Sequence, residues 1–208
     1  MPVKKGKRRP QEKKEKIMQA TMRLLLKKGS YAAATSTTDI CKAARLTRPT
    51  LYHYFGSKRN LIFSVHMYSI ETGLRPYVEK ASAIEDPMER LTYMVRTFTT
   101  EIICKHPELR CLIHDTLSIR DKYFREVREE WKRHYLLLRN TIAELQSQGK
   151  VSGLIKASYA ALFLLGMMTW ITFWFEYDQK DEIEALGDAV VAFVMHGLGG
   201  LEHRSSGP

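Results

Sequence analysis

The sequence has few cysteines and lacks the common catalytic signatures. Its three cysteines, Cys41, Cys104 and Cys111, are an odd number and form no disulfide framework, so we expect reduced thiols in a cytoplasmic protein. No nucleophile elbow, phosphate-binding loop or HExxH motif occurs. The nearest approach to a metal cluster adds His106 and His114 to two of these cysteines, and its spacing matches no standard site. These absences argue against an enzyme, and we expect neither a metal nor a cofactor.

Alternating apolar and polar residues of the kind that form strands are also missing, and there is no internal repeat. Low-complexity composition is confined to the final stretch, GLGGLEHRSSGP. Apolar side chains instead recur at helical spacing, in segments separated by Pro, Gly and capping residues. The sequence therefore predicts an all-α protein of about nine helices.

Acidic residues are scarce at the beginning of the chain. Residues 1–60 contain 16 Lys and Arg against 3 Asp and Glu, whereas residues 61–208 contain 17 against 20. A basic first quarter joined to a slightly acidic remainder indicates a module that binds polyanions on a body that does not. The alternative is a basic face that is merely solvated. Because the N-terminus is charged, we also expect no secretory signal.

A single uncharged stretch raises the question of a membrane span. Residues 159–175, YAALFLLGMMTWITFWF, contain no charged side chain, and their length lies at the short edge of the roughly 17–25 residues that cross a bilayer. Lys156 and Glu176 bracket this stretch, and the helix that follows is amphipathic. We therefore expect a buried core or dimer helix here and no membrane partner.

Residues 35–58, TSTTDICKAARLTRPTLYHYFGSK, concentrate the start signals of three helices. Ser36 precedes Asp39 at the spacing of a capping box, Thr47 is an N-cap candidate, and Ser57 caps a further helix. Pro49 falls in the first turn of its helix, where its missing N–H costs nothing. Residues 44–47 then form the turn between two short helices, which is the spacing of a helix-turn-helix.

The second helix of such a motif enters the major groove of DNA. We expect Arg48 and Thr50, at its start, to contact base edges, with Arg48 favouring guanine. Tyr52 and His53 are placed to donate to phosphates; the alternatives are packing for Tyr52 and no contact with DNA for His53. Residues at the starts of the flanking helices are further candidates, because a helix N-terminus favours an anion; these are Thr37, Thr38 and Lys58. Leu51, Tyr54 and Phe55 are interpreted as packing residues.

A first helix of about nineteen residues followed by TSTTDICKAARLTRPTLYHYFGSKRNL resembles the N-terminal module of the tetracycline-repressor (TetR) family of bacterial transcription regulators. The resemblance covers about residues 11–62. It implies DNA contacts from Thr38, Thr47, Arg48, Pro49, Thr50, Tyr52, His53 and Lys58. Two positions depart from the family pattern. Arg45 stands where the family usually has Gly, so a left-handed backbone there would be strained, and Thr38 stands where a longer residue is common.

The resemblance also implies a domain organisation. Residues 1–10 are expected to be a disordered basic arm, 11–57 a helix-turn-helix domain of three helices, 58–200 a helical domain that binds an effector and dimerises, and 201–208 a flexible tail. The later helices are predicted from Ser57 to a break near Pro76, then at 87–105, 107–118, 121–148, 156–177 and 181–198. The family dimerises through its last two helices, here 159–175 and 189–198.

These observations predict a ligand-responsive regulator, most simply a repressor that binds a palindromic double-stranded DNA operator as a homodimer and is released by a small-molecule effector. The run LLGMMTWITFWFEYD resembles a stretch found in regulators of this family that respond to acyl-coenzyme A thioesters. The effector would then be apolar or acyl-CoA-like. The competing interpretation is a helical adaptor whose basic N-terminus binds an anionic membrane or a protein.

The sequence has fewer signals for the effector pocket than for the DNA-binding module. An apolar tunnel is expected from Phe98, Trp131, Tyr135, Met168, Trp170 and Trp174. A phosphorylated headgroup would be held by Arg110, Arg120, Lys122, Arg125 and Arg128. The alternatives are that Trp170 and Trp174 pack a dimer core and that the cations lie on solvated helix faces.

Overall fold

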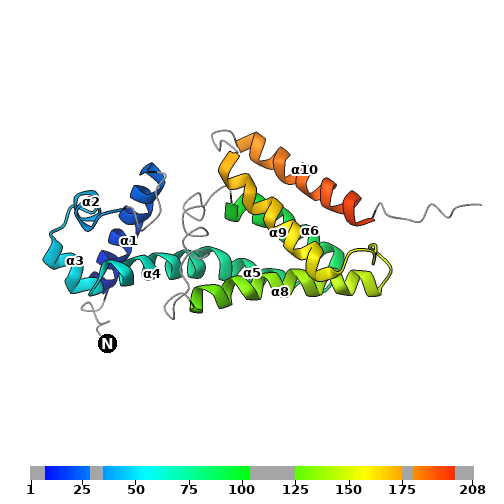
Figure 1. Cartoon of the computed structure of the whole chain (residues 1–208), viewed down its shortest axis with the longest axis horizontal. Helices are drawn as coiled ribbons and strands as arrows, with labels where there is room; N and C mark the ends of the chain where they lie inside the picture. The colour runs from blue at the N-terminus through cyan, green and yellow to red at the C-terminus, as the bar shows by residue number, and fades with distance from the viewer. Residues whose placement is uncertain (1–7, 29–34, 104–124, 175–179, 200–208) are drawn as a thin grey trace, which may run out of the picture. The chain divides into compact units, whose positions relative to one another are not determined.

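The computed structural model describes residues 8–28, 35–103, 125–174 and 180–199, and over these ranges it contains helices and turns but no strand (Figure 1). The all-α prediction is confirmed. The elements in chain order are α1 (Arg8–Lys28), α2 (Thr37–Ala43), α3 (Arg48–Phe55), α4 (Lys58–Ser69), the π-helical segment η2 (Ile70–Leu74), α5 (Arg75–Ser82), α6 (Pro87–Thr97), the π-helical segment η3 (Phe98–Ile103), α8 (Arg125–Ser147), α9 (Ala157–Trp174) and α10 (Lys180–Gly199).

The chain divides into two compact units. The first consists of residues 1–72 and 107–128 and contains α1 to α4. The second consists of residues 73–106 and 129–208 and contains α5, α6, η3, α9, α10 and most of α8. The boundary at residues 72–73 falls inside η2, so the chain passes between the units within an uninterrupted helical run from α4 to α5.

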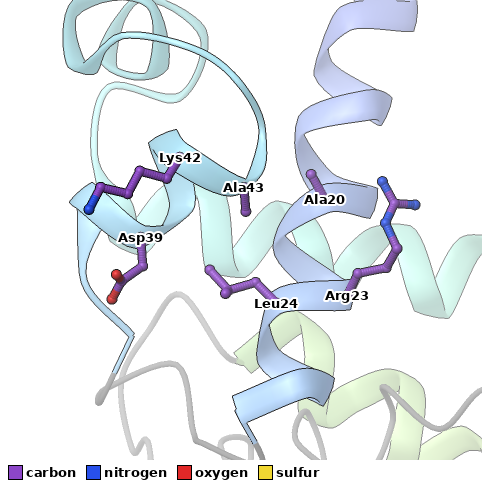
Figure 2. Close-up of a pocket in the computed structure, with 6 residues that line it drawn as sticks. All are labelled: Ala20, Arg23, Leu24, Asp39, Lys42 and Ala43. Atoms are coloured by element: carbon purple, nitrogen blue, oxygen red, sulfur yellow. The ribbon is translucent and has the colours of Figure 1, made fainter.

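The core of the first unit is built from one face of each helix. Ile17, Thr21 and Leu25 of α1 are buried, and the hydroxyl of Thr21 is satisfied by donating to the carbonyl of Ile17 at 2.8 Å. Leu24 is only half-buried. It extends from α1 toward α2 in a shallow groove, and the exposed Ala43 of α2 lines the same groove (Figure 2).

Three N-caps fix the starts of α2, α3 and α4, as the sequence predicted. The hydroxyl of Ser36 accepts from the backbone N–H of Asp39 at 3.1 Å, Thr47 accepts from that of Thr50 at 3.4 Å, and Ser57 accepts from that of Asn60 at 3.0 Å. Each bond satisfies a donor that has no partner inside its helix. The starting points of all three helices are therefore fixed by local chemistry.

The turn after α2 is a Schellman motif. The N–H of Arg45 donates to the carbonyl of Lys42, and the N–H of Leu46 donates to that of Cys41. The same pair of bonds ends α8, where Gly149 occupies the left-handed position with φ 67°. At the end of α2 this position is taken by Arg45 with φ 52°. The strain expected for a non-glycine residue in this turn is therefore present.

Helix α9 in the second unit has two different apolar faces. Ala160, Ala161, Leu164 and Met168 are buried, whereas the opposite side is exposed. We call that side the α9 stripe; its residues are Tyr159, Leu162, Phe163, Gly166, Trp170 and Trp174. Apart from the adjacent pair Leu162 and Phe163, successive members are three or four residues apart, so they lie on one side of the helix.

Helix α10 packs closely on α6 and η3. A Cβ atom on Gly187 would lie 2.5 Å from Cγ2 of Thr100, so a side chain at this position has no room. Arg96 of α6 forms ion pairs with Glu184 and Asp188 of α10, on either side of Gly187 in the sequence. These contacts join α10 to the core of the second unit.

Pro76 does not end a helix as expected. It lies in the first turn of α5, directly after η2, where its missing N–H is tolerated. Asp86 caps α6, which begins at Pro87 as predicted, but the helix predicted to run to residue 105 changes to π-helical geometry at Phe98. The helix predicted at 107–118 lies outside the described residues.

Replacing Arg45 with Gly should stabilise the first unit by up to about 1 kcal/mol. Relief of the left-handed conformation, roughly 1–2 kcal/mol, exceeds the extra conformational entropy that Gly loses on folding, roughly 0.5–1 kcal/mol. The measurement is the urea midpoint of unfolding. Arg45→Ala is the matched control, because it removes the same side chain and keeps the strain. Equal midpoints for the two variants would contradict the expectation.

Candidate nucleic-acid interface and effector site

Helix α3 has a buried side and an exposed side. Leu51 and Phe55 are 0% and 7% exposed and anchor the helix in the first unit. The exposed side, which we call the α3 face, consists of Arg48, Pro49, Tyr52 and His53. Tyr52 is 45% exposed although it is a large aromatic residue. An exposed aromatic beside a cation and an imidazole is suited to polar contacts with a partner rather than to packing.

Arg48 is held in place from across the turn. Its Nη2 donates to Oγ1 of Thr38 in α2 at 2.5 Å. A guanidinium has five N–H donors, so this bond leaves a pair available for a bidentate contact. The sequence placed Thr38 among the DNA contacts but did not reveal this pairing, which joins residues ten positions apart on two helices.

The remaining residues predicted to contact DNA lie around the same helix ends. Thr47 is exposed and its hydroxyl is 2.9 Å from that of Thr50. Thr37 begins α2 and Lys58 begins α4, and both are half-buried. The predicted residues therefore lie on α3, on its N-cap Thr47 and on the first residues of α2 and α4.

Tyr54 is half-buried, in line with its interpretation as a packing residue. The ammonium of Lys13 in α1 lies 5.6 Å from the centroid of its ring, within the range of a cation–π contact. Nothing in the sequence indicated this contact between the basic start of α1 and α3. Cys41 is also buried, and burial raises the pKa of its thiol, so it is not a reactive thiolate.

In the second unit, two residues of the predicted tunnel meet in a buried aromatic cluster. The ring centroids of Phe98 and Trp131 are 6.4 Å apart, and His134 lies 4.6 Å from Phe98. Tyr77 completes this group, which we call the aromatic cluster, with its ring centroid 5.2 Å from that of His134. His134 and Tyr77 were not predicted from the sequence, because neither belongs to a recognisable motif and the two residues are 57 positions apart.

The other predicted tunnel residues lie in different environments. Met168 is 1% exposed and Tyr135 is half-buried. Trp170 and Trp174, by contrast, are 61% and 74% exposed and contact each other at a centroid distance of 6.2 Å. A shallow apolar depression is lined by these two tryptophans with Met167, Ile171 and Leu186. The two tryptophans are thus far more exposed than the aromatic cluster.

Of the cations expected at a headgroup, Arg125 is exposed and Arg128 is half-buried, whereas Arg110, Arg120 and Lys122 lie outside the described residues. The expected cysteine and histidine candidates at 104–114 lie outside them too. Within the described ranges, His, Cys, Asp and Glu side chains form no group of three or more that could hold a metal ion. No described helix is both long enough and apolar enough to span a bilayer.

Two family models match the chain. Residues 17–65 match the model of the bacterial regulatory proteins of the tetR family, and residues 85–198 match the tetracycline repressor-like C-terminal domain. No curated protein matches the sequence.

Solved structures share the fold over nearly their whole length. AibR, solved in complex with isovaleryl coenzyme A and operator DNA, is 23% identical with a TM-score of 0.76, over 87% of this chain and 97% of that one. PfmR from Thermus thermophilus is 24% identical with a TM-score of 0.76, over 90% and 99%. FadR from Bacillus subtilis, solved with stearoyl-CoA, is 18% identical with a TM-score of 0.68, over 88% and 98%.

The family predicted from the LYHYFGSK run is confirmed, and with it a regulator rather than a helical adaptor. The family and these neighbours are transcriptional regulators and not enzymes. Because the C-terminal model alone spans more than half of the 208 residues, this protein belongs to the TetR family of bacterial transcriptional regulators.

Proposed function

We propose that this regulator is a repressor that binds a palindromic operator as a homodimer through the α3 face and is released by an acyl-CoA-like effector bound in the second unit. The observation that carries the proposal is the α3 face itself. It combines an exposed aromatic, an imidazole and an Arg fixed by Thr38 on the side opposite Leu51 and Phe55.

In the proposed complex, some side chains contact base edges and others contact phosphates. Arg48 and Thr50 start the helix that enters the major groove and contact base edges. Tyr52, His53 and Lys58 donate to phosphates on either side, as does Thr37 from the start of α2. Thr47 caps α3 from the N-terminal side, and Pro49 sets its first turn. The excess of basic residues in positions 1–60 supplies the long-range attraction to the polyanion.

Arg48→Ala should weaken binding to the cognate operator by roughly 1–3 kcal/mol and leave binding to unrelated duplexes nearly unchanged. The reason is that a bidentate contact to a base is lost while most phosphate contacts remain. Fluorescence anisotropy with an operator obtained by selection from random duplexes gives both affinities.

Arg23→Ala is the matched control for Arg48→Ala. Arg23 is an exposed arginine of α1 beside the α1–α2 groove, so its removal makes the same change in net charge away from the α3 face (Figure 2). If Arg48→Ala lowered affinity for all duplexes equally, Arg48 would be a phosphate contact and the proposed assignment to a base edge would be wrong.

The α9 stripe is the surface that we assign to the dimer. Phe163 is 65% exposed, Trp174 is 74% exposed, and Gly166 at the middle of the stripe allows another helix to approach closely. Phe193 of α10 is 67% exposed as well. Apolar exposure on this scale marks an interaction surface. A second copy of the chain fits it best, because two recognition helices are needed to read a palindrome.

Phe163→Asp should therefore convert the dimer to a monomer at micromolar concentration and reduce operator affinity at least tenfold, since each monomer then contacts a single half-site. Sedimentation velocity and anisotropy measure the two effects. Leu154→Asp is the control, because Leu154 is 72% exposed but precedes α9 rather than lying in the stripe. A Phe163→Asp protein that remained dimeric would rule the stripe out as the interface.

The proposed effector site keeps Phe98, Trp131, Tyr135 and Met168, which are buried or half-buried in the second unit. Trp170 and Trp174 are assigned to the dimer interface instead, because both are largely exposed. An acyl-CoA thioester is the proposed ligand class. It is supported by the resemblance of the α9 sequence and by the ligands of AibR and FadR.

Release would be a population shift, in which bound ligand favours an arrangement whose two α3 faces are wrongly spaced for the operator. The helical run from α4 to α5 is the proposed connection. It begins at Lys58, a proposed phosphate contact, and continues to Tyr77 of the aromatic cluster.

Adding medium- and long-chain acyl-CoA to the protein–operator complex should weaken DNA binding by about 5–150-fold, the usual range of coupling between two sites. Free coenzyme A is the control, because it carries the headgroup without the acyl chain. Operator affinity that stayed constant across acyl chain lengths would reject this effector class while leaving the DNA-binding assignment untouched.

A further inference from the structure

A buried hydrogen-bonded pair joins α5 to α8 inside the second unit. The hydroxyl of Tyr77 lies 3.1 Å from the carbonyl oxygen of Met94 and 3.0 Å from Nε2 of His134. Tyr77 and His134 are 4% and 1% exposed. Burial lowers the pKa of His134 to about 3, so the imidazole is neutral at pH 7 and carries one ring proton. The position of that proton decides what the ring can bind.

The pair is best satisfied when the proton is on Nε2. The hydroxyl of Tyr77 then donates to the carbonyl of Met94 and accepts from Nε2–H, so two hydrogen bonds form. With the proton on Nδ1, the hydroxyl would have to donate to Nε2, and Met94 would lose its bond from Tyr77. Burial also raises the pKa of Tyr77, so its hydroxyl keeps the proton that this arrangement requires.

This tautomer leaves Nδ1 of His134 as a bare acceptor. In the part of the chain that the structure describes, Nδ1 is buried without a hydrogen-bond partner. A buried acceptor without a donor is unfavourable and is rare in folded proteins. The ring lies beside Phe98 at 4.6 Å and Trp131 at 6.4 Å, and both belong to the proposed effector site. The unpartnered Nδ1 is therefore a polar atom of a ring that lies against two residues of the proposed effector site.

We propose that Nδ1 of His134 accepts a hydrogen bond from an O–H or N–H group on the effector, so that the site selects acyl thioesters whose chain carries a hydrogen-bond donor. The inference rests on the proposed function, because it assigns a polar anchor to the same effector site. Phe98 and Trp131 contact the apolar part of the chain, and His134 recognises the donor. Tyr77 is a positioning residue, since it fixes the tautomer without touching the ligand.

The test compares octanoyl-CoA with 2-hydroxyoctanoyl-CoA and 3-hydroxyoctanoyl-CoA by calorimetry on the full-length protein. At least one hydroxylated compound should bind about 3- to 10-fold more tightly than octanoyl-CoA, the range expected for one hydrogen bond. His134→Phe should abolish this preference and keep the affinity for octanoyl-CoA. His66→Phe is the matched control, because His66 is also buried, at 2% exposed, but lies in α4 of the first unit. The His66→Phe protein should prefer the hydroxylated compound over octanoyl-CoA to the same degree as the wild type.

If His134→Phe does not fold, the tautomer of His134 and its contact with the ligand can be tested on the wild-type protein. In protein labelled with ¹⁵N-histidine, the nitrogen shifts of His134 should show Nδ1 without a proton, and this shift should move when the preferred hydroxylated compound binds. A protonated Nδ1, or equal affinity for all three compounds, would overturn this inference alone. Failure of all three compounds to bind would overturn the proposed effector class, and this inference with it.

Discussion

The DNA-reading part of this regulator depends on hydrogen bonds at helix ends. Helix α3 has eight residues, fewer than the roughly 12–15 at which an isolated helix becomes even marginally stable in water. Its position is set by the Schellman turn after α2, by the Thr47 cap, and by the burial of Leu51 and Phe55. The turn and the cap lie within a few residues of α3, whereas the burial of Leu51 and Phe55 depends on the other helices of the first unit.

The second unit is organised by a different constraint, the excess of apolar surface on α9. This helix is apolar around its whole circumference, and the unit buries only the side that carries Ala160, Ala161, Leu164 and Met168. Leaving the α9 stripe in water is unfavourable at roughly 25 cal/mol for each Å² that a partner covers. In the proposed dimer, pairing of two chains would cover this surface and would also bring together the two α3 faces that a palindromic operator requires.

Local features were predictable from the sequence, and long-range pairings were not. The caps at Ser36, Thr47 and Ser57, the strained turn at Arg45 and the all-helical class follow from residue type and spacing over a few positions. The family followed from one run of residues. The Thr38–Arg48 bond, the Lys13–Tyr54 contact and the Tyr77–His134 pair were missed, because each joins two different helices. Periodicity also could not tell which face of α9 is covered, because apolar residues occupy both faces of this helix. The π-helical geometry at 70–74 and 98–103 has no signal that we could identify in the sequence.

The contact of Gly187 with Thr100 bears on the alignment of α10 along its own axis. The ion pairs that Arg96 makes on either side of Gly187 involve exposed groups, and surface pairs of this kind contribute little, typically about 0–1 kcal/mol each. The steric requirement is stronger, because a displacement of α10 by one turn would bring Ile183 or Val191 against Thr100 in place of Gly187. The absence of a side chain at Gly187 therefore sets the axial register of α10, and this register fixes the height along the helix at which the exposed side chain of Phe193 is presented.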